Sequence, residues 1–199
     1  MQENKLNYGK TFLLGFGFFA VMVAWSVYNS FVPLFLGNKF NLSPATIGFF
    51  MTLDNIAALF LQPVIGSISD RTRTKIGRRL PFMLVGAPIA AIAFFFAPMA
   101  AIPMLDIPSS AQLPLFVTCT ITFMLAMAIW RTPVVALMPD VTPSRFRSQA
   151  NGVINFMGGV GSIIAFLIGG KLYKINQAYP FWLAAVLVLV GVFLVFLFI

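Results

Sequence analysis

Long apolar runs separated by short polar stretches fill the chain from residue 11 to its end. Six of these runs reach the roughly 20 residues that a helix needs to cross the hydrocarbon core of a bilayer. They predict helices at residues 11–36, 44–69, 80–101, 114–138, 148–170 and 178–199. The pattern therefore predicts an all-α integral membrane protein, in which a polar segment (residues 1–10) precedes a six-helix domain (residues 11–199).

The prolines fit this division of the chain. Ser43 followed by Pro44 is the usual pairing of an N-cap with a first-turn proline, so a helix is expected to begin there. Pro81 and Pro114 are expected near helix starts for the same reason. Other prolines fall inside the apolar runs, which membrane helices tolerate because neighbouring helices and side chains satisfy the freed carbonyls.

Composition excludes a soluble fold and most catalytic centres. Sixty per cent of the 199 residues are apolar and 9% are charged, whereas soluble domains carry about 25% charged residues. The chain has no His and one Cys, Cys119, within an apolar run. Its acids are Glu3, Asp54, Asp70, Asp106 and Asp140. We therefore expect no catalytic residues, no metal site and no cofactor.

The basic residues predict the orientation in the membrane. One side of the predicted bundle carries Lys5, Lys10, Arg71, Arg73, Lys75, Arg78, Arg79, Arg145 and Arg147. The other side carries Lys39, Lys171 and Lys174. The positive-inside rule then places both termini in the cytoplasm of a multi-pass cell-membrane protein. Because the charges lie in short loops between apolar runs, the net charge of +8 does not indicate binding to nucleic acid.

The last predicted helix has no polar residue after it. Phe196, Leu197, Phe198 and Ile199 still belong to an apolar run, with no basic or aromatic anchor following. We interpret the chain as one half of a protein about twice as long, fused to or paired with a second half. A natural six-helix protein that dimerises is the alternative.

The loop after the second apolar run carries a motif. Gly66 is followed after three residues by Asp70, and Gly77-Arg78-Arg79 comes later in the loop. The pattern resembles the loop between helices two and three of the major facilitator superfamily. The long spacing resembles two branches, the glycoside-pentoside-hexuronide cation symporters and the sucrose-transporter-like carriers. Gln62-Pro63 before the motif and Pro81-Phe82 after it favour the second branch.

A second matching segment supports this resemblance. Pro133–Ser144, followed by Arg147-Ser148 and Ala150-Asn151, resembles the sucrose-type carriers, and the two matches occur in the expected order. The resemblance implies a 3+3 inverted repeat that forms the N-terminal half of a transporter. It also implies a C-terminal six-helix half as partner, with the substrate bound between the halves.

The motif has a physical interpretation. Gly66 lets helices approach closely, Asp70 ends the second run, and Arg78 or Arg79 can fold back onto that acid. An Asp70–Arg78–Asp140 cluster would hold one conformation, and the resemblance implies that this loop is a conformational latch. Its expected members are Gly66, Asp70, Arg71, Gly77, Arg78, Arg79 and Asp140. The alternative is that the charges only anchor the loop on the cytoplasmic side.

Polar residues inside lipid are costly and are therefore candidates for a binding site. Asp54 and Asn55 lie about 15 Å from the outer end of the second run, given a rise of about 1.5 Å per residue. Trp25, Tyr28 and Asn29 share one helix face through i, i+3 and i+4 spacing. We expect these five residues to form an upper polar level. Trp25 and Tyr28 could instead pack against neighbouring helices.

A lower polar level is expected about 10–12 Å from the cytoplasmic side. It contains Gln62, Arg131 and Asn155, with Trp130 beside Arg131. Trp25, Tyr28 and Trp130 offer aromatic plates for sugar C–H faces, and the polar residues offer hydrogen bonds to hydroxyls. Asn155 could instead join helices by hydrogen bonds. A direct ion pair between Asp54 and Arg131 would need Arg131 to reach upward.

These features predict secondary transport of a sugar or glycoside, most simply a disaccharide. Asp54 is the acid placed to carry a proton, whereas Ala58 and Gln62 replace the acidic ion ligands that the cation-symporter branch has at the lower end of helix two. The expected partners are a sugar, a proton, the lipid bilayer and the second half. The alternatives are an exporter of apolar drugs with the same fold, an integral-membrane enzyme, and a non-transporting sensor or assembly subunit.

Overall fold

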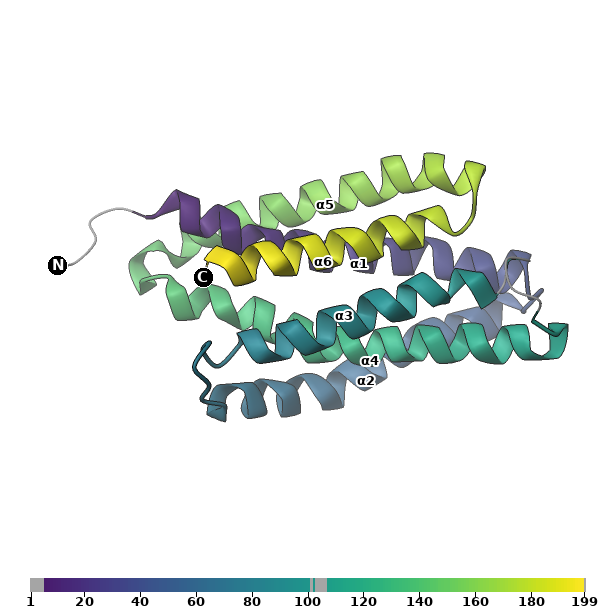
Figure 1. Ribbon diagram of the computed structural model, residues 1–199, viewed down its shortest axis with the longest axis horizontal. Coiled ribbons are helices and arrows are strands. Elements are labelled where there is room, and N and C mark those ends of the chain that lie inside the picture. Colours follow the sequence, from purple (N-terminus) through teal and green to yellow (C-terminus); the bar gives the residue numbers. More distant parts are fainter. Residues whose placement is uncertain (1–5, 101, 103–106, 199) are drawn as a thin grey trace.

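A computed structural model describes residues 6–100, 102 and 107–198. Glu3, Lys5, Ala101, Asp106 and Ile199, which entered the predictions above, lie outside this range. The described residues form six helices long and apolar enough to cross a membrane (Figure 1). They are α1 (Tyr8–Asn38), α2 (Pro44–Arg71), α3 (Leu80–Phe96), α4 (Ser109–Val141), α5 (Arg147–Ile175) and α6 (Tyr179–Phe198), with short 3₁₀ turns η1 (Pro98–Ala100) and η2 (Ser144–Phe146). The predicted all-α membrane fold is confirmed.

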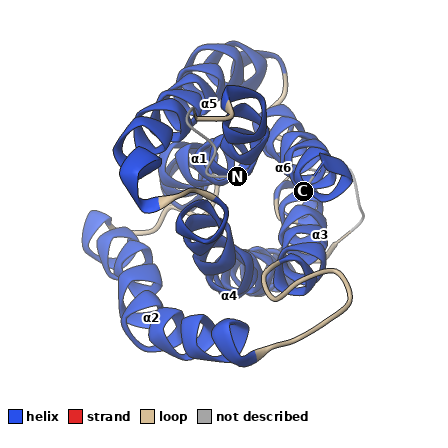
Figure 2. Cartoon of the chain, turned by 90° about the vertical axis from the view of Figure 1, so that its left-hand side faces the viewer, coloured by secondary structure: helices blue, strands red, loops and turns tan. Residues whose placement is uncertain are grey.

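The six helices run alternately up and down one bundle. The N-terminal part, the C-terminal end, the α2–α3 loop and the α4–α5 loop all lie at the same end (Figure 1). We call it the basic end, defined by Lys10, the Arg-rich loop 72–79 and the loop 142–146. The other end is called the opposite end. Seen along the bundle, α2 stands at the periphery beside α4, whereas α1 packs against α5 and α6 (Figure 2).

Helix starts follow local capping chemistry. The Ser43 hydroxyl accepts a hydrogen bond from the Thr46 amide, and Pro44 opens α2, as predicted. Pro81 lies in the first turn of α3. The expectation for Pro114 was wrong, because α4 begins at Ser109 and Pro114 lies inside it. Residues 109–112 are polar or small, so hydropathy did not reveal that α4 begins before Pro114.

Several other helices also extend beyond the apolar runs. α1 begins at Tyr8 because the Asn7 side chain accepts a hydrogen bond from the Lys10 amide. α5 continues to Ile175, beyond the predicted limit of residue 170. α3 instead ends early, at Phe96, and Pro98 begins the 3₁₀ turn η1. Polar residues at a membrane surface can remain helical, so an apolar run gives a lower bound on helix length.

Glycines let α1 approach α5 and α6 closely. A Cβ on Gly161 would lie 2.7 Å from the Phe19 carbonyl oxygen, and one on Gly191 would lie 2.8 Å from the Phe16 carbonyl oxygen. Side chains larger than hydrogen therefore cannot be accommodated there without moving a backbone. These contacts hold α1, α5 and α6 together as one packed unit.

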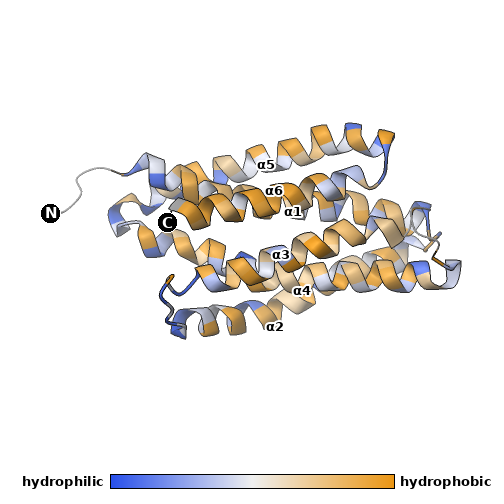
Figure 3. Cartoon of the chain, viewed as in Figure 1, coloured by the Kyte–Doolittle hydropathy of each residue, from blue (hydrophilic) through white to orange (hydrophobic). Residues whose placement is uncertain are grey.

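The exterior of the bundle is apolar along its middle and polar at both ends (Figure 3). Exposed side chains on α2 include Phe49, Leu59 and Phe60, each at least 66% exposed. Such a surface is unfavourable in water and suits hydrocarbon or another protein. In α2 the buried residues are Phe50, Asp54 and Ser69, so this helix buries one acid while most of its apolar side chains remain uncovered.

Candidate functional site

A recess opens between α1, α2 and α4, about midway along the helices. Its polar lining comes from Asp54, Asn55, Gln62 and Arg131, and Trp25 supplies an aromatic ring. The apolar lining is Ala57, Ala58, Met124, Met127 and Ala128. The recess has a volume of about 40 Å³, which accommodates one or two polar groups of a ligand. Five of the predicted site residues therefore meet in one place.

Residues of both expected polar levels line this one recess. α2 and α4 run in the same direction side by side, so the segment from Asp54 to Gln62 lies beside the segment from Met124 to Arg131. Arg131 lies ten residues before the end of α4 because this helix continues to Val141. At a rise of about 1.5 Å per residue it sits roughly 15 Å from that end, deeper than expected. Asp54 lies 17 residues before the end of α2, so the two charged residues still differ in depth by roughly 10 Å.

Arg131 lies against the ring of Trp25. The guanidinium carbon is 5.5 Å from the ring centroid, within the range of a cation–π interaction. Trp25 in turn stacks on Tyr28, with ring centroids 5.3 Å apart and an angle of 16° between the ring planes. In the recess, Trp25 therefore forms an aromatic wall that Tyr28 supports by stacking, and Arg131 offers N–H groups that can donate hydrogen bonds.

Asp54 is the acid of the recess and is 8% exposed. The Asn55 amide donates a hydrogen bond of 3.2 Å to its Oδ1 atom. Asp54 and Arg131 face the same space and their charges attract, but no N–O distance between them falls within the 4.0 Å of an ion pair. Opposite charges thus share the recess without direct contact, which leaves both able to meet a polar ligand.

Four predicted site residues do not line this recess. Tyr28 is fully buried behind Trp25, and its hydroxyl lies 3.4 Å from the Met124 sulfur. Trp130 is also fully buried, and its Cβ would be 2.8 Å from a Cβ on Gly86 of α3. Neighbouring helical residues point about 100° apart, and Trp130 is directed toward α3 while Arg131 faces the recess.

The two remaining asparagines are bonded within their own helices. Asn29 is exposed and donates to the Trp25 carbonyl at 2.9 Å. Asn155 is also exposed and donates to the carbonyl and the side-chain oxygen of Asn151, at 2.8 and 2.9 Å. Neither amide joins two helices through these bonds.

The sequence prediction missed the methionines and small residues of the recess. Met124, Met127 and Ala128 precede Arg131 by seven, four and three residues, and Ala57 and Ala58 follow Asp54 by three and four. These are the helical neighbours of the two charged residues. Extending each charged position along its own helix face would have identified them.

Charges at the basic end form a compact network around Arg79. This side chain is 7% exposed, and its guanidinium contacts Asp70 at 2.5 Å, Asp140 at 2.9 Å and the hydroxyl of Ser69. Arg78 is 48% exposed and binds both oxygens of Asp140, at 2.6 and 3.2 Å. The bridge expected of Arg78 between the two acids is therefore made by Arg79. It joins α2, α3 and α4.

The other expected latch residues surround this network. Gly66 lies where α2 meets α4, and a Cβ there would be 3.6 Å from Thr132. Gly77 has φ +93°, a conformation that L side chains rarely adopt, and the Thr74 hydroxyl bonds to its carbonyl. Arg71 is exposed in the last turn of α2. Among the described residues, no group of three or more acids and cysteines could hold a metal ion.

Six membrane-spanning helices with a polar recess midway between them suggest a solute carrier. The sequence profile of the Major Facilitator Superfamily matches residues 14–199. The chain belongs to this superfamily. The expected resemblance is confirmed, and so is the expected multi-pass membrane protein. Members of the superfamily are transporters, which points to transport rather than to catalysis.

Curated relatives extend the match toward sugar carriers. An uncharacterized symporter of Synechocystis is 27% identical over 172 residues, covering 84% of this chain and 31% of the relative. The general alpha-glucoside permease of Schizosaccharomyces pombe is 32% identical over 127 residues, covering 60% and 23%. A sucrose transport protein of Arabidopsis thaliana is 27% identical over 173 residues, covering 81% and 29%. The match thus spans between 23% and 31% of the length of these three relatives.

Proposed function

We propose that this superfamily member forms half of a secondary transporter for a sugar or glycoside, with a disaccharide as the preferred cargo. The observation that carries the proposal is the recess, where Trp25, Arg131, Asp54, Asn55 and Gln62 converge midway along the helices. Substrate binds between this half and a second, pseudo-symmetric half, and rocking of the two gives alternating access. The relatives named for sucrose and alpha-glucosides support this choice of cargo.

The recess matches the surface of a sugar. A pyranose ring has an apolar C–H face, which stacks on an aromatic ring such as Trp25, and hydroxyls that need both donors and acceptors. Arg131 and Gln62 supply donors, while Asp54 and the Asn55 carbonyl supply acceptors. A cavity of about 40 Å³ holds only part of a disaccharide, so the rest must contact the facing half. For this reason we expect residues 1–199 alone, as a monomer, not to transport.

Proton coupling is assigned to Asp54. Among the described acids, Asp70 and Asp140 lie at helix ends and are ion-paired, whereas Asp54 is buried beside a cation without an ion pair. Its carboxylate can exchange a proton as the recess opens to either side. Ala58 and Gln62, one and two turns further along α2, provide no carboxylate for a sodium ion, so the proton is the preferred coupling ion.

The network at the basic end is proposed as the conformational latch. Arg79 holds the ends of α2 and α4 together through Asp70 and Asp140, and Gly66 leaves α2 room to move against α4. Breaking these contacts would let the basic end open. Cytoplasmic orientation of that end follows from the excess of Lys and Arg and remains part of the proposal.

The test is uptake of labelled sucrose, maltose and trehalose into proteoliposomes that contain this chain together with its second half. An inward proton gradient should stimulate uptake of at least one sugar. Asp54→Asn should abolish the stimulation, whereas Asp54→Glu, which keeps a carboxyl group at the same position, should retain part of it. Gradient-stimulated uptake that survives Asp54→Asn would disprove the coupling assignment.

The same preparation separates sugar transport from the alternatives. If the folded protein takes up no sugar but moves a lipophilic dye along the gradient, the cargo is an apolar drug instead of a sugar. Failure of both would favour a sensor or assembly subunit, and a dominant heteromeric complex in a pull-down would then identify it.

A further inference from the structure

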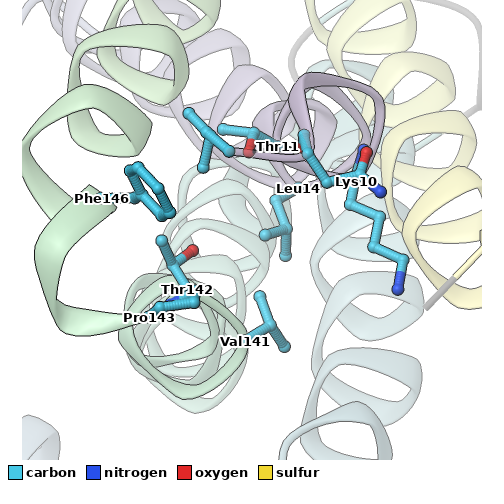
Figure 4. A pocket seen from close by; sticks show the side chains of 9 residues that line it. Lys10, Thr11, Leu14, Val141, Thr142, Pro143 and Phe146 are labelled. Carbon is cyan, nitrogen blue, oxygen red and sulfur yellow. Dashed lines mark hydrogen bonds between the residues drawn. The ribbon is translucent and has the colours of Figure 1, made fainter. Parts of the chain in front are cut away.

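A second cavity lies at the basic end, well away from the recess (Figure 4). It is enclosed between the first turns of α1 and the turn that joins α4 to α5, and has a volume of about 60 Å³. The residues that line it are Leu6, Asn7, Lys10, Thr11, Leu14, Val141, Thr142, Pro143 and Phe146. None of the contacts proposed above for sugar or proton transport uses this cavity.

Thr142 presents an unused hydroxyl to this cavity. The residue is 6% exposed, and no hydrogen bond involves its side chain within the described residues. Its hydroxyl points across the cavity toward Thr11 and Leu14 (Figure 4). The other side-chain oxygens there are occupied, because Thr11 donates to the Asn7 carbonyl and the Asn7 side chain accepts from the Lys10 amide. A hydroxyl that faces a cavity and bonds to no protein group is available to a bound polar group.

The charges around the cavity favour an anion. Lys10 lines it, and its ammonium group makes no ion pair or hydrogen bond with a described residue. The cavity also faces the N-terminus of α1, a helix of 31 residues, where the helix dipole attracts negative charge. The nearest described acid along the chain, Asp140, is already neutralised by Arg78 and Arg79.

The opposing helix end at this cavity is electrostatically capped. The C-terminus of α4 would otherwise repel an anion, since its last carbonyls carry partial negative charge. Arg147 donates to the carbonyls of Pro139 at 3.0 Å and Thr142 at 3.4 Å, which neutralises that end. The cavity is left with the Lys10 ammonium group and the Thr142 hydroxyl as donors from two helix ends.

We propose that this cavity binds a phosphate group that carries net negative charge, with Lys10 and Thr142 as its ligands. The apolar part of the lining, which includes Leu14, Val141 and Phe146, would contact carbon atoms attached to the phosphate. The same chemistry is offered by an anionic phospholipid headgroup at the membrane surface and by a phosphate ion in solution. The site is independent of the sugar recess, so its failure would leave the proposed transport function untouched.

The test compares phosphatidylglycerol with phosphatidylcholine by native mass spectrometry of the detergent-purified protein. Phosphatidylglycerol should bind in preference. Lys10→Gln should weaken its binding about tenfold, because a charge-assisted bond is lost. Thr142→Val, which keeps the shape and removes the hydroxyl, should weaken it roughly threefold. Arg73→Gln, an equal loss of charge in the neighbouring loop, should leave it unchanged. A second arm measures the rise in unfolding temperature with inorganic phosphate against chloride of equal ionic strength.

Each outcome decides the proposal. Phosphatidylglycerol binding that depends on both Lys10 and Thr142 supports the site with a lipid source. Stabilisation by inorganic phosphate with the same dependence supports it with a solution source. Binding that depends on Lys10 alone, binding that neither substitution changes, or no binding of either probe would overturn it. Because Lys10 is exposed and Thr142→Val is isosteric, both variants should fold, which a monodisperse elution profile checks.

Discussion

The two groups of charges in this bundle are built in opposite ways. At the basic end, Arg79 contacts two acids and a serine hydroxyl, and both acids that the structure describes there have a cation within 2.9 Å. In the recess, Asp54 and Arg131 share one space without an ion pair. Paired charges stabilise a structure, whereas unpaired charges in an apolar interior cost free energy and remain available to a ligand. The comparison therefore separates charges that hold the fold from charges that serve transport.

The largest effect is expected from breaking the paired group at its centre. Arg79→Met should lower the free energy of unfolding by about 3 kcal/mol, because two acids lose their shared cation. Unfolding in mixed detergent and dodecyl sulfate micelles measures this. Arg78→Met is the matched control and should cost about 1 kcal/mol or less, since Arg78 is 48% exposed. Equal costs for the two variants would contradict the central role of Arg79.

Double-mutant cycles compare the two groups directly. The coupling energy between Arg79 and Asp140, 2.9 Å apart, should reach about 1.5–2 kcal/mol. The coupling between Arg131 and Asp54 should stay below about 0.5 kcal/mol because they make no direct bond. Unfolding measurements on single and double variants give both values. A larger coupling in the recess than at the basic end would reverse the distinction drawn here.

Neutralising the recess acid should act in the opposite direction. Asp54→Asn is expected to leave the free energy of unfolding unchanged or to raise it by up to about 1 kcal/mol. The substitution keeps the shape of the side chain and removes an unpaired buried charge. In the reconstituted transporter, the same variant should lose gradient-stimulated sugar uptake. A marked loss of stability would show that Asp54 is part of the structural framework instead.

A small effect on stability is also expected at Arg131. Arg131→Gln removes the cation beside Trp25, an interaction of about 0.5–1 kcal/mol. The loss of sugar-binding free energy should exceed the loss of unfolding free energy, because the substitution removes a hydrogen-bond donor and disturbs the aromatic wall. Equilibrium binding of the preferred sugar, measured beside unfolding of the same preparation, tests this. Trp25→Phe keeps a ring and should retain more affinity than Trp25→Leu.

Hydropathy was sufficient to predict six helices, since each apolar run is long enough to span a bilayer. It could not predict helix ends such as Ser109, because polar residues at the membrane surface stay helical. In the recess, the cost of placing charged side chains inside a membrane identified Asp54 and Arg131 as candidate site residues. Trp130 faces away from the recess because of the rotation of α4, which its close contact with Gly86 sets. No local sequence pattern reveals this rotation.

The glycine contacts of α1 also bear on how the protein moves. Gly161 and Gly191 bring α5 and α6 against the backbone of α1 so closely that sliding one past another would create clashes. These three helices should therefore move together as one rigid body. α2 packs mainly on α4 and buries few of its residues, which makes it the helix most free to swing. Spin labels on α1 and α5 should report one narrow distance, and labels on α2 and α5 a broad distribution that a bound sugar sharpens.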